Sequence, residues 1–397
     1  MFKRTQRGAV LATAFATFIA FMGIGVVDPL LPLIGKSMGA DYFQIEWLFT
    51  TYIATMALTM LLAGAISTRM GNKKTLLAGL LIVVVFSALS GISPNIPFFA
   101  AMRGFWGFGN ALFTSTALAI IVGVSAGKVE KSITLYEAAL GLGISSGPLL
   151  GGLLGSFYWR DPFFGTSALM ATGFILTMIL VREPPAREPA RRARDVVRAL
   201  LHKGIRSNAL IGLCYNFGFF TVLAYTPLTL VGLTTIELGI TYFFWGILVA
   251  LSSVYLVNLA AARLSYTSIA LIALVAMVGI FVGLAIFVRS FGLYLVVLSG
   301  IPCGLANAGF TTMAMKVSPF SRSISSGSYN FLRWSGAAVA PILAGYIGQT
   351  YGIGIPFAVS ATIMALGIGL LSFRKRMLNQ FIIGHSIPVE MAPSLAR

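Results

Sequence analysis

Charged side chains are scarce in this chain of 397 residues. Asp, Glu, Lys and Arg make up 10% of it, whereas 57% is hydrophobic and the mean hydropathy is +0.90. A soluble globular domain carries about 25% charged residues. The composition therefore excludes a soluble domain and predicts a membrane protein.

Cysteine and histidine are also nearly absent. Cys214 and Cys303 lie in apolar segments without CxxC spacing, so we expect packing residues rather than a disulfide or a metal site. His202 and His385 fall in the expected linker and tail, where neither can serve a membrane-embedded metal. The chain has no GxxxxGK[ST] loop and no nucleophile–base pair in an apolar segment. We therefore expect no ATP-driven step, no cofactor and no enzymatic activity.

Long apolar segments dominate what remains. A bilayer core of about 30 Å needs about 20 helical residues to cross it. Segments of this kind recur six times in each half of the chain, so we expect an all-α membrane protein with twelve transmembrane helices. The expected spans are 9–34, 46–67, 75–93, 97–122, 132–156, 162–181, 208–230, 238–261, 267–288, 292–315, 324–348 and 353–373.

The distribution of basic residues predicts the topology. With the N-terminus inside, most of the 28 lysines and arginines fall in cytoplasmic segments, as the positive-inside rule requires. The net charge of +17 is thus a topology signal, and we expect no nucleic-acid partner. We predict a multi-pass protein of a prokaryotic inner membrane with both termini cytoplasmic.

A basic, proline-containing segment separates the two sets of six spans. Its second part has apolar residues at helical spacing opposite arginines. This pattern predicts an amphipathic helix on anionic lipids, with a solvated linker as the alternative. The expected units are a first six-helix bundle (1–181), the cytoplasmic linker (182–207) and a second bundle with its tail (208–397).

The two halves echo one another. The glycine-rich stretch 141–155 has a looser copy at 335–348, and their prolines, Pro148 and Pro341, are 193 residues apart. Small residues of this kind let membrane helices approach closely. Two further local matches occur in the same order at similar offsets, so we predict two pseudo-symmetric bundles with a central cavity.

Ionisable residues inside spans are functional candidates, because charge in hydrocarbon is costly. Asp28 and Arg103 lie at similar depths, about 10 and 9 Å from the outer span ends, which permits an ion pair. The pair would either couple proton flow to transport or serve as a structural salt bridge. Glu137 would neutralise Arg69 or Lys73 at an inner gate, pair with Arg333, carry protons, or simply extend toward the interface.

Polar and aromatic side chains predict the lining of the central cavity. Trp106, Asn110 and Thr114 follow Arg103 on one helix face, which should not contact lipid; helix–helix packing through Asn110 is the alternative. Aromatic residues favour a lipophilic or weakly cationic substrate. The expected cavity residues are Tyr52, Trp106, Asn110, Thr114, Asn216, Asn307, Thr311, Asn330 and Arg333.

Three motifs together resemble the major facilitator superfamily, and more closely its twelve-span drug–proton antiporters. They are the loop Gly64-Ala-Ile-Ser-Thr68-Arg69-Met-Gly71-Asn-Lys73-Lys74, the segment Arg103-Gly104-Phe-Trp-Gly107-Phe-Gly109, and the glycine-rich stretch 141–155. The loop departs from the family pattern, which has an aspartate where this chain has Thr68. The resemblance implies proton coupling through acidic and arginine positions, here Asp28, Arg103 and Glu137.

The expected function is a proton-coupled secondary transporter that exports lipophilic compounds by alternating access. A proton-coupled or facilitative carrier of a small metabolite or sugar is the alternative. We expect a monomer whose glycine-rich stretch works as a hinge and seal against the other half. The expected gate residues are Gly64, Arg69, Gly71, Lys73, Gly143, Gly147, Pro148, Gly151 and Pro341.

Overall fold

The computed structural model describes residues 4–124, 129–183, 193–320 and 322–384, and no strand occurs among them. The first half contains α1 (Arg4–Gly25), η1 (Asp28–Leu30), α2 (Leu31–Met38), α3 (Tyr42–Met70), α4 (Asn72–Gly91), α5 (Ile96–Val124), α6 (Val129–Gly155) and α7 (Asp161–Leu180). The second contains α8 (Ala193–Ala199), α9 (Lys203–Phe220), η2 (Thr221–Tyr225), α10 (Thr226–Thr229), α11 (Thr235–Leu251), η3 (Ser252–Leu256), α12 (Val257–Ala261), α13 (Tyr266–Lys316), α14 (Arg322–Tyr351) and α15 (Ile355–Gly384).

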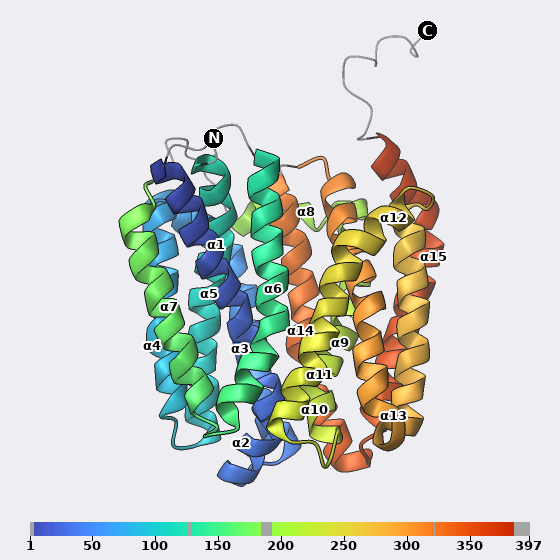
Figure 1. Cartoon of the computed structure of the whole chain (residues 1–397). Coiled ribbons are helices and arrows are strands. Elements are labelled where there is room, and N and C mark those ends of the chain that lie inside the picture. Colours follow the sequence, from blue (N-terminus) through green and yellow to red (C-terminus); the bar gives the residue numbers. More distant parts are fainter. Residues whose placement is uncertain (1–3, 125–128, 184–192, 321, 385–397) are drawn as a thin grey trace.

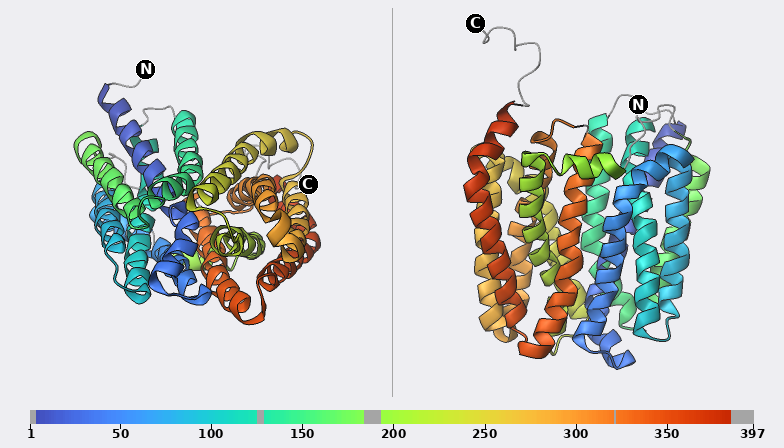
Figure 2. Two further views of the ribbon diagram at one scale, coloured as in Figure 1. Left: turned by 60° about the horizontal axis from the view of Figure 1, so that its bottom comes forward. Right: turned by 180° about the vertical axis from the view of Figure 1, so that it is seen from behind.

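The helices form two bundles that stand side by side. Helices α1–α7 make the first bundle and α9–α15 the second, and α1 begins at the same end of the molecule at which α15 ends (Figure 1). Seen from behind, α8 lies across that end (Figure 2). We call the opposite end, where α2 lies, the distal end.

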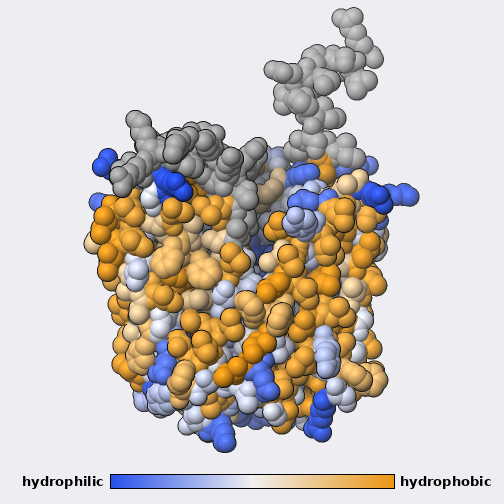
Figure 3. All heavy atoms as spheres, in the orientation of Figure 1, coloured by the Kyte–Doolittle hydropathy of each residue, from blue (hydrophilic) through white to orange (hydrophobic). Residues whose placement is uncertain are grey.

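The molecule has the surface and helix lengths of a multi-pass membrane protein. Within the described residues, eight helical segments are long and apolar enough to cross a bilayer. The 51 residues of α13 form two helices that meet at Phe287 (φ −119°, ψ 20°), which is enough for two crossings of a bilayer core. The side of the molecule is largely hydrophobic, and hydrophilic residues gather toward both ends (Figure 3). These features agree with the predicted twelve spans.

The second membrane-spanning helix of each bundle, α3 or α11, begins at the distal end with the same kind of N-terminal cap. Asp41 accepts a hydrogen bond from the Gln44 N–H, and Gln44 reaches back to the Asp41 N–H. Thr234 and Glu237 form the same reciprocal capping box at the start of α11. The two boxes are 193 residues apart, the same spacing as Pro148 and Pro341.

The first span is interrupted, although the sequence predicts one continuous helix over 9–34. α1 ends at Gly25, and a single 3₁₀ turn begins at Asp28, with Pro29 in its first turn, where no N–H is needed. In the second bundle a π-helical turn begins at Thr221, 193 residues after Asp28. Irregular turns of this kind are frequent at functional sites.

Candidate functional site

Arg103 lies on α5 in the interior of the first bundle, and its side chain is fully buried. Its Nε donates to the Leu48 carbonyl at 3.3 Å, and Nη1 donates to the Gly23 carbonyl at 3.4 Å. The guanidinium carbon lies 4.4 Å from the ring centre of Tyr52 and 4.6 Å from that of Trp106. Carbonyl oxygens and π-faces thus stabilise the buried cation, while Nη2 has no hydrogen-bond partner.

Asp28 is fully buried where the first span is interrupted, and neither carboxyl oxygen has a hydrogen-bond partner. The predicted ion pair with Arg103 is therefore not formed in this conformation, although the two groups interact electrostatically. Equal depth does not ensure contact, because the rotation of a helix decides where its side chains point. Burial without a hydrogen-bond partner makes the charged form of a carboxyl group costly.

The other predicted cavity residues of the first bundle lie together but are packed. Asn110 donates from Nδ2 to the Tyr52 hydroxyl and to the Ala20 carbonyl. The rings of Tyr52 and Trp106 meet edge to face, with centroids 6.1 Å apart. All three side chains are fully buried, and Thr114 is 9% exposed. In this conformation the stripe joins α1, α3 and α5.

The predicted residues of the second bundle are more accessible. Arg333 donates from Nη1 to Asn307 Oδ1 at 2.7 Å, and its guanidinium lies over the rings of Tyr329 and Trp334. Asn307, Asn330 and Arg333 are partly exposed and Thr311 is exposed, whereas Asn216 is buried. These residues of the second bundle are therefore less tightly packed than the stripe of the first bundle.

Glu46, in the second turn of α3, is a candidate that the sequence analysis missed. Its side chain is fully buried, and both carboxyl oxygens lack a hydrogen-bond partner. Position 46 falls at the predicted edge of a span, where hydropathy alone cannot show whether a side chain is in water. The capping box that starts α3 at Asp41 is the signal that could have shown it, because it places Glu46 one turn inside the helix.

The bundles contact each other at the distal end through α3 with α14 and α6 with α11. Thr50 donates to the Ala338 carbonyl at 2.9 Å, and the Gln349 side-chain amide donates to Asp41 at 3.2 Å. On the other side, a Cβ added to Gly152 would lie 2.7 Å from the Thr235 carbonyl oxygen. At Gly152 the contact between α6 and α11 is therefore backbone against backbone, and together the two contacts close the distal end.

The glycine-rich stretch has two faces, which corrects the prediction that it seals against the other half. A Cβ at Gly143, Gly147 or Gly151 would lie 2.1–2.4 Å from carbonyl oxygens of residues 18–26, within the same bundle. Gly152 contacts α11 of the other bundle, as does Ser145 through Gly246. Gly143, Gly147 and Gly151, three of the four predicted gate residues on this stretch, therefore pack α6 against α1 and the turn that follows α1.

Pro148 lies where the two faces of α6 meet. Its ring would lie 2.9 Å from a Cβ at Gly25, and its carbonyl oxygen 2.7 Å from a Cβ at Gly239. Pro341 lies inside α14, the counterpart of α6. Both prolines thus occupy the helices that join the bundles.

The predicted loop motif lies at the end opposite the distal end. Gly71 (φ +91°) separates α3 from α4, a conformation that favours glycine. The N–H groups of Asn72 and Lys73 donate to the two carboxylate oxygens of Glu183, at 2.6 and 2.8 Å. Glu183 thus occupies the positive N-terminal end of α4, and the sequence analysis did not single it out.

The remaining motif residues have local roles in this conformation. Lys73 Nζ donates to the Met178 carbonyl at 3.0 Å, and Thr68, in place of the usual aspartate, bonds the Gly64 carbonyl of its own helix at 2.8 Å. Arg69 is exposed. The side chain of Glu137 lies outside the described residues, so its predicted gate contact stays a prediction.

The predicted amphipathic helix of the linker is present in part as α8, which contacts α3 and α14. Ala199 is fully buried, whereas Val197 and Leu201 are exposed. Residues 184–192 lie outside the described residues. The short helix therefore touches both bundles and exposes Val197, and the exposed Leu201 follows its end.

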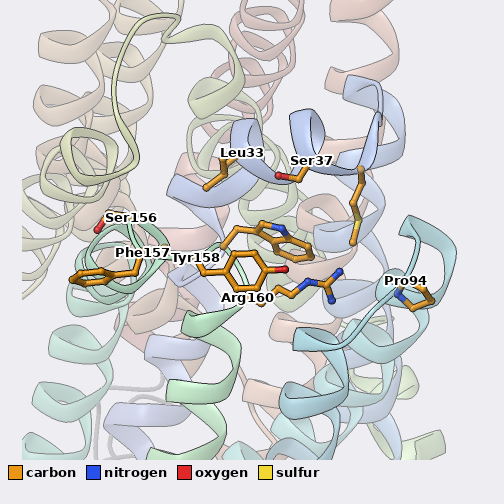
Figure 4. A pocket seen from close by; sticks show the side chains of 10 residues that line it. Leu33, Ser37, Pro94, Ser156, Phe157, Tyr158 and Arg160 are labelled. Atoms are coloured by element: carbon orange, nitrogen blue, oxygen red, sulfur yellow. The ribbon is translucent and has the colours of Figure 1, made fainter.

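A separate pocket of about 740 Å³ opens at the distal end of the first bundle (Figure 4). Tyr158 and Arg160 contribute side chains to it, and α2 supplies Leu33 and Ser37. None of the predicted site residues lines this pocket. No group of three or more His, Cys, Asp or Glu side chains that could hold a metal ion occurs in the part of the chain that the structure describes.

Comparison with known proteins identifies the family. The family model of the Major Facilitator Superfamily matches residues 13–341. The chain belongs to the major facilitator superfamily. This major facilitator protein is therefore a multi-pass membrane transporter of a small molecule and not an enzyme.

The chain is also similar to individual members. It is 41% identical over 385 residues to the multidrug efflux protein YfmO of Bacillus subtilis, covering 96% of each chain. Its fold resembles that of a D-xylose–proton symporter (TM-score 0.76, 12% identity, 92% and 96% coverage). A bacterial homologue of the human lysosomal transporter Spinster, solved inward-facing and unoccupied, has a TM-score of 0.70 at 14% identity over 97% and 98%. At these identities the solved structures show the fold alone.

Proposed function

We propose that this protein is a proton-coupled exporter of lipophilic compounds that works by alternating access in a bacterial inner membrane, with both termini cytoplasmic. The observation that carries the proposal is the 41% identity, over nearly the whole of both chains, to a protein named for multidrug efflux. In this orientation the distal end faces the outside of the cell. We further propose that the protein works as a monomer and that α8 contacts anionic lipids of the inner leaflet.

Asp28 is the proposed coupling group. It is buried, lacks a hydrogen-bond partner and interacts electrostatically with Arg103. With the distal end closed, the carboxyl is neutral because burial disfavours the charged form. When water reaches the residue, the proton can leave, and the resulting carboxylate is attracted to the Arg103 cation. Protonation of Asp28 therefore favours the packing of the first bundle in which the carboxyl group is buried, and loss of the proton favours a packing in which water reaches it.

Asp28→Asn tests the coupling. The full chain is reconstituted in phospholipid vesicles with an imposed pH gradient, ethidium as the substrate probe and a pH-sensitive dye. The unsubstituted protein should move ethidium against proton flow, whereas Asp28→Asn should lose gradient-driven movement because the amide cannot exchange a proton. Asp161→Asn, at the start of α7, is the matched control and should behave like the unsubstituted protein.

The outcomes separate the possible functions. Gradient-driven ethidium movement by Asp28→Asn at every pH would remove Asp28 from the mechanism. Uptake of a polar probe such as D-xylose, without ethidium-linked proton movement, would replace the exporter by a metabolite carrier.

A further inference from the structure

Glu46 is a second buried carboxyl group that the proposed mechanism leaves without a role. It lies where α3 of the first bundle meets α14 of the second. Its Cγ lies 2.8 Å from the position of a Cβ on Gly345, so the side chain passes over the glycine of the other bundle. Contacts between the bundles flank it: Gln349 bonds Asp41, and Thr50 bonds the Ala338 carbonyl.

Among the described residues, no lysine or arginine donates a hydrogen bond to the Glu46 carboxyl group. Asp28 of η1, Tyr225 of η2 and Tyr242 of α11 interact with it electrostatically, and Tyr42 is one turn before it on α3. Tyrosines are neutral in the physiological range. Ionisation would therefore bury a negative charge that has no hydrogen-bond partner and that interacts unfavourably with a second carboxylate if Asp28 is also ionised, which is costly.

The pseudo-symmetry of the fold supplies an internal comparison. Gly345 contacts α3 as Gly152, 193 residues earlier, contacts α11. By the same offset, the counterpart of Glu46 is Gly239, whose Cα lies 2.9 Å from the Cβ position of Gly152. A glycine thus suffices for packing at this point of the repeat. The carboxyl group is an addition that only one half carries.

The other buried acid follows the same rule. The counterpart of Asp28 is Thr221, whose hydroxyl donates to the Phe217 carbonyl of its own helix. Both buried carboxyl groups therefore belong to the first half, and the equivalent positions of the second half are neutral. The two groups interact electrostatically within the first bundle, so the charge of one changes the cost of ionising the other.

We propose that Glu46 is a proton-binding site of the transport cycle, occupied while the distal contact is closed and able to release its proton when that contact opens. The proposal rests on the proposed proton coupling. Opening at α3–α14 exposes Glu46 to water and allows the carboxyl O–H to lose H⁺ to solvent. Reclosure requires that H⁺ return to the carboxylate. Binding of a proton from the distal side thereby favours the closed distal end.

Spin labels across the contact test this directly, without transport. Phe43 and Tyr346 face each other with ring centroids 6.1 Å apart, so Phe43→Cys/Tyr346→Cys in a chain with Cys214→Ser and Cys303→Ser reports its opening. Between about pH 5 and 9, across the range of perturbed carboxyl groups, the label distances should shift from short to long. With Glu46→Gln the short distance should persist at every pH.

Two further variants keep the test decisive. Glu46→Gly introduces the residue found at the equivalent position of the second half. It should also keep the short distance at every pH, and it replaces Glu46→Gln in the test if that variant folds poorly. Glu237→Gln is the control, because Gln44 fills the same capping position in the first half, and it should keep the pH response. A pH response in Glu46→Gln and Glu46→Gly equal to that of the unsubstituted chain, or none in the unsubstituted chain, would overturn the proposal.

Vesicle assays separate this proposal from the proposed function. If the unsubstituted chain moves ethidium against protons, Glu46→Gln should show a smaller number of protons moved per ethidium. An unchanged number would count against Glu46 as a proton site while leaving the exporter intact. If the unsubstituted chain moves no protons with ethidium, the proposed function fails, and with it the transport role of Glu46 whatever the label distances show.

Discussion

At the scale of single residues, burial without a partner distinguishes Asp28 and Glu46 from the other acidic groups that the structure describes. Arg103, in contrast, is held by two carbonyl oxygens and two aromatic rings. The cation therefore has stabilising contacts besides its electrostatic interaction with Asp28.

Single glycines determine how closely α6 packs on the first span. Gly151→Leu should lower stability by about 1–3 kcal/mol, the usual cost of overpacking, because a Cβ there would lie 2.1 Å from the Val26 carbonyl oxygen. The melting temperature of the purified protein in detergent measures this. Gly279→Leu is the control, since no atom lies within 4 Å of its Cβ position. Equal melting temperatures for the two variants would refute the assigned contact.

At the scale of elements, the connection between α3 and α4 depends on the carboxylate of Glu183, a residue that follows α7. Glu183 satisfies two N–H groups at the start of α4, as a capping side chain does. Lys73 adds a bond from its side chain to the end of α7. These bonds tie the motif loop to the last helix of the same bundle.

Glu183→Ala should lower the stability of the protein by about 1 kcal/mol, the typical value of a helix cap. The expected effect is a lower melting temperature and faster hydrogen exchange at the Asn72 and Lys73 amides, measured by mass spectrometry. Lys74→Ala, an exposed neighbour, should change neither. Unchanged exchange in Glu183→Ala would show that the cap does not protect these amides in solution.

At the scale of the whole molecule, the duplication determines how the bundles meet. Each half contributes a small-residue helix, α6 or α14, that packs on the second helix of the other half, α11 or α3. A further pair of equivalent glycines, Gly155 and Gly348, makes close contacts within each half, against the side chains of Leu30 and Tyr225. The two contacts form a pair related by pseudo-symmetry, so we expect opening of the distal end to break both together.

Gly152→Leu should push the bundles apart at the distal end, because a Cβ there would lie 2.7 Å from the Thr235 carbonyl oxygen. A larger residue destabilises only the closed arrangement and therefore shifts the population toward the open one. The Phe43→Cys/Tyr346→Cys label pair, on the other side of the contact, should report longer distances at low pH. Gly279→Leu should leave them short; short distances in both variants would contradict coupled opening.

The sequence predicts the class of the molecule and the candidates for its chemistry. Apolar runs determine the helices, and the 193-residue spacing of the repeat recurs in caps, helix interruptions and glycine contacts. Arg103 and Asp28 are identified because charge is rare in these spans. Glu46 is not identified, because the sequence alone does not show whether a residue at the end of a span is buried or in contact with water.

The sequence by itself determined a helical membrane transporter made of two related halves, because hydrophobicity and repetition are properties of the chain. Only the tertiary structure decided which faces meet. The rotation of the helices placed Gly143, Gly147 and Gly151 against α1 and the turn that follows it. It also kept Asp28 from pairing with Arg103. The packing of α3 on α14 buried Glu46 between the bundles. These outcomes depend on packing between distant segments, and spacing along a single helix cannot specify them.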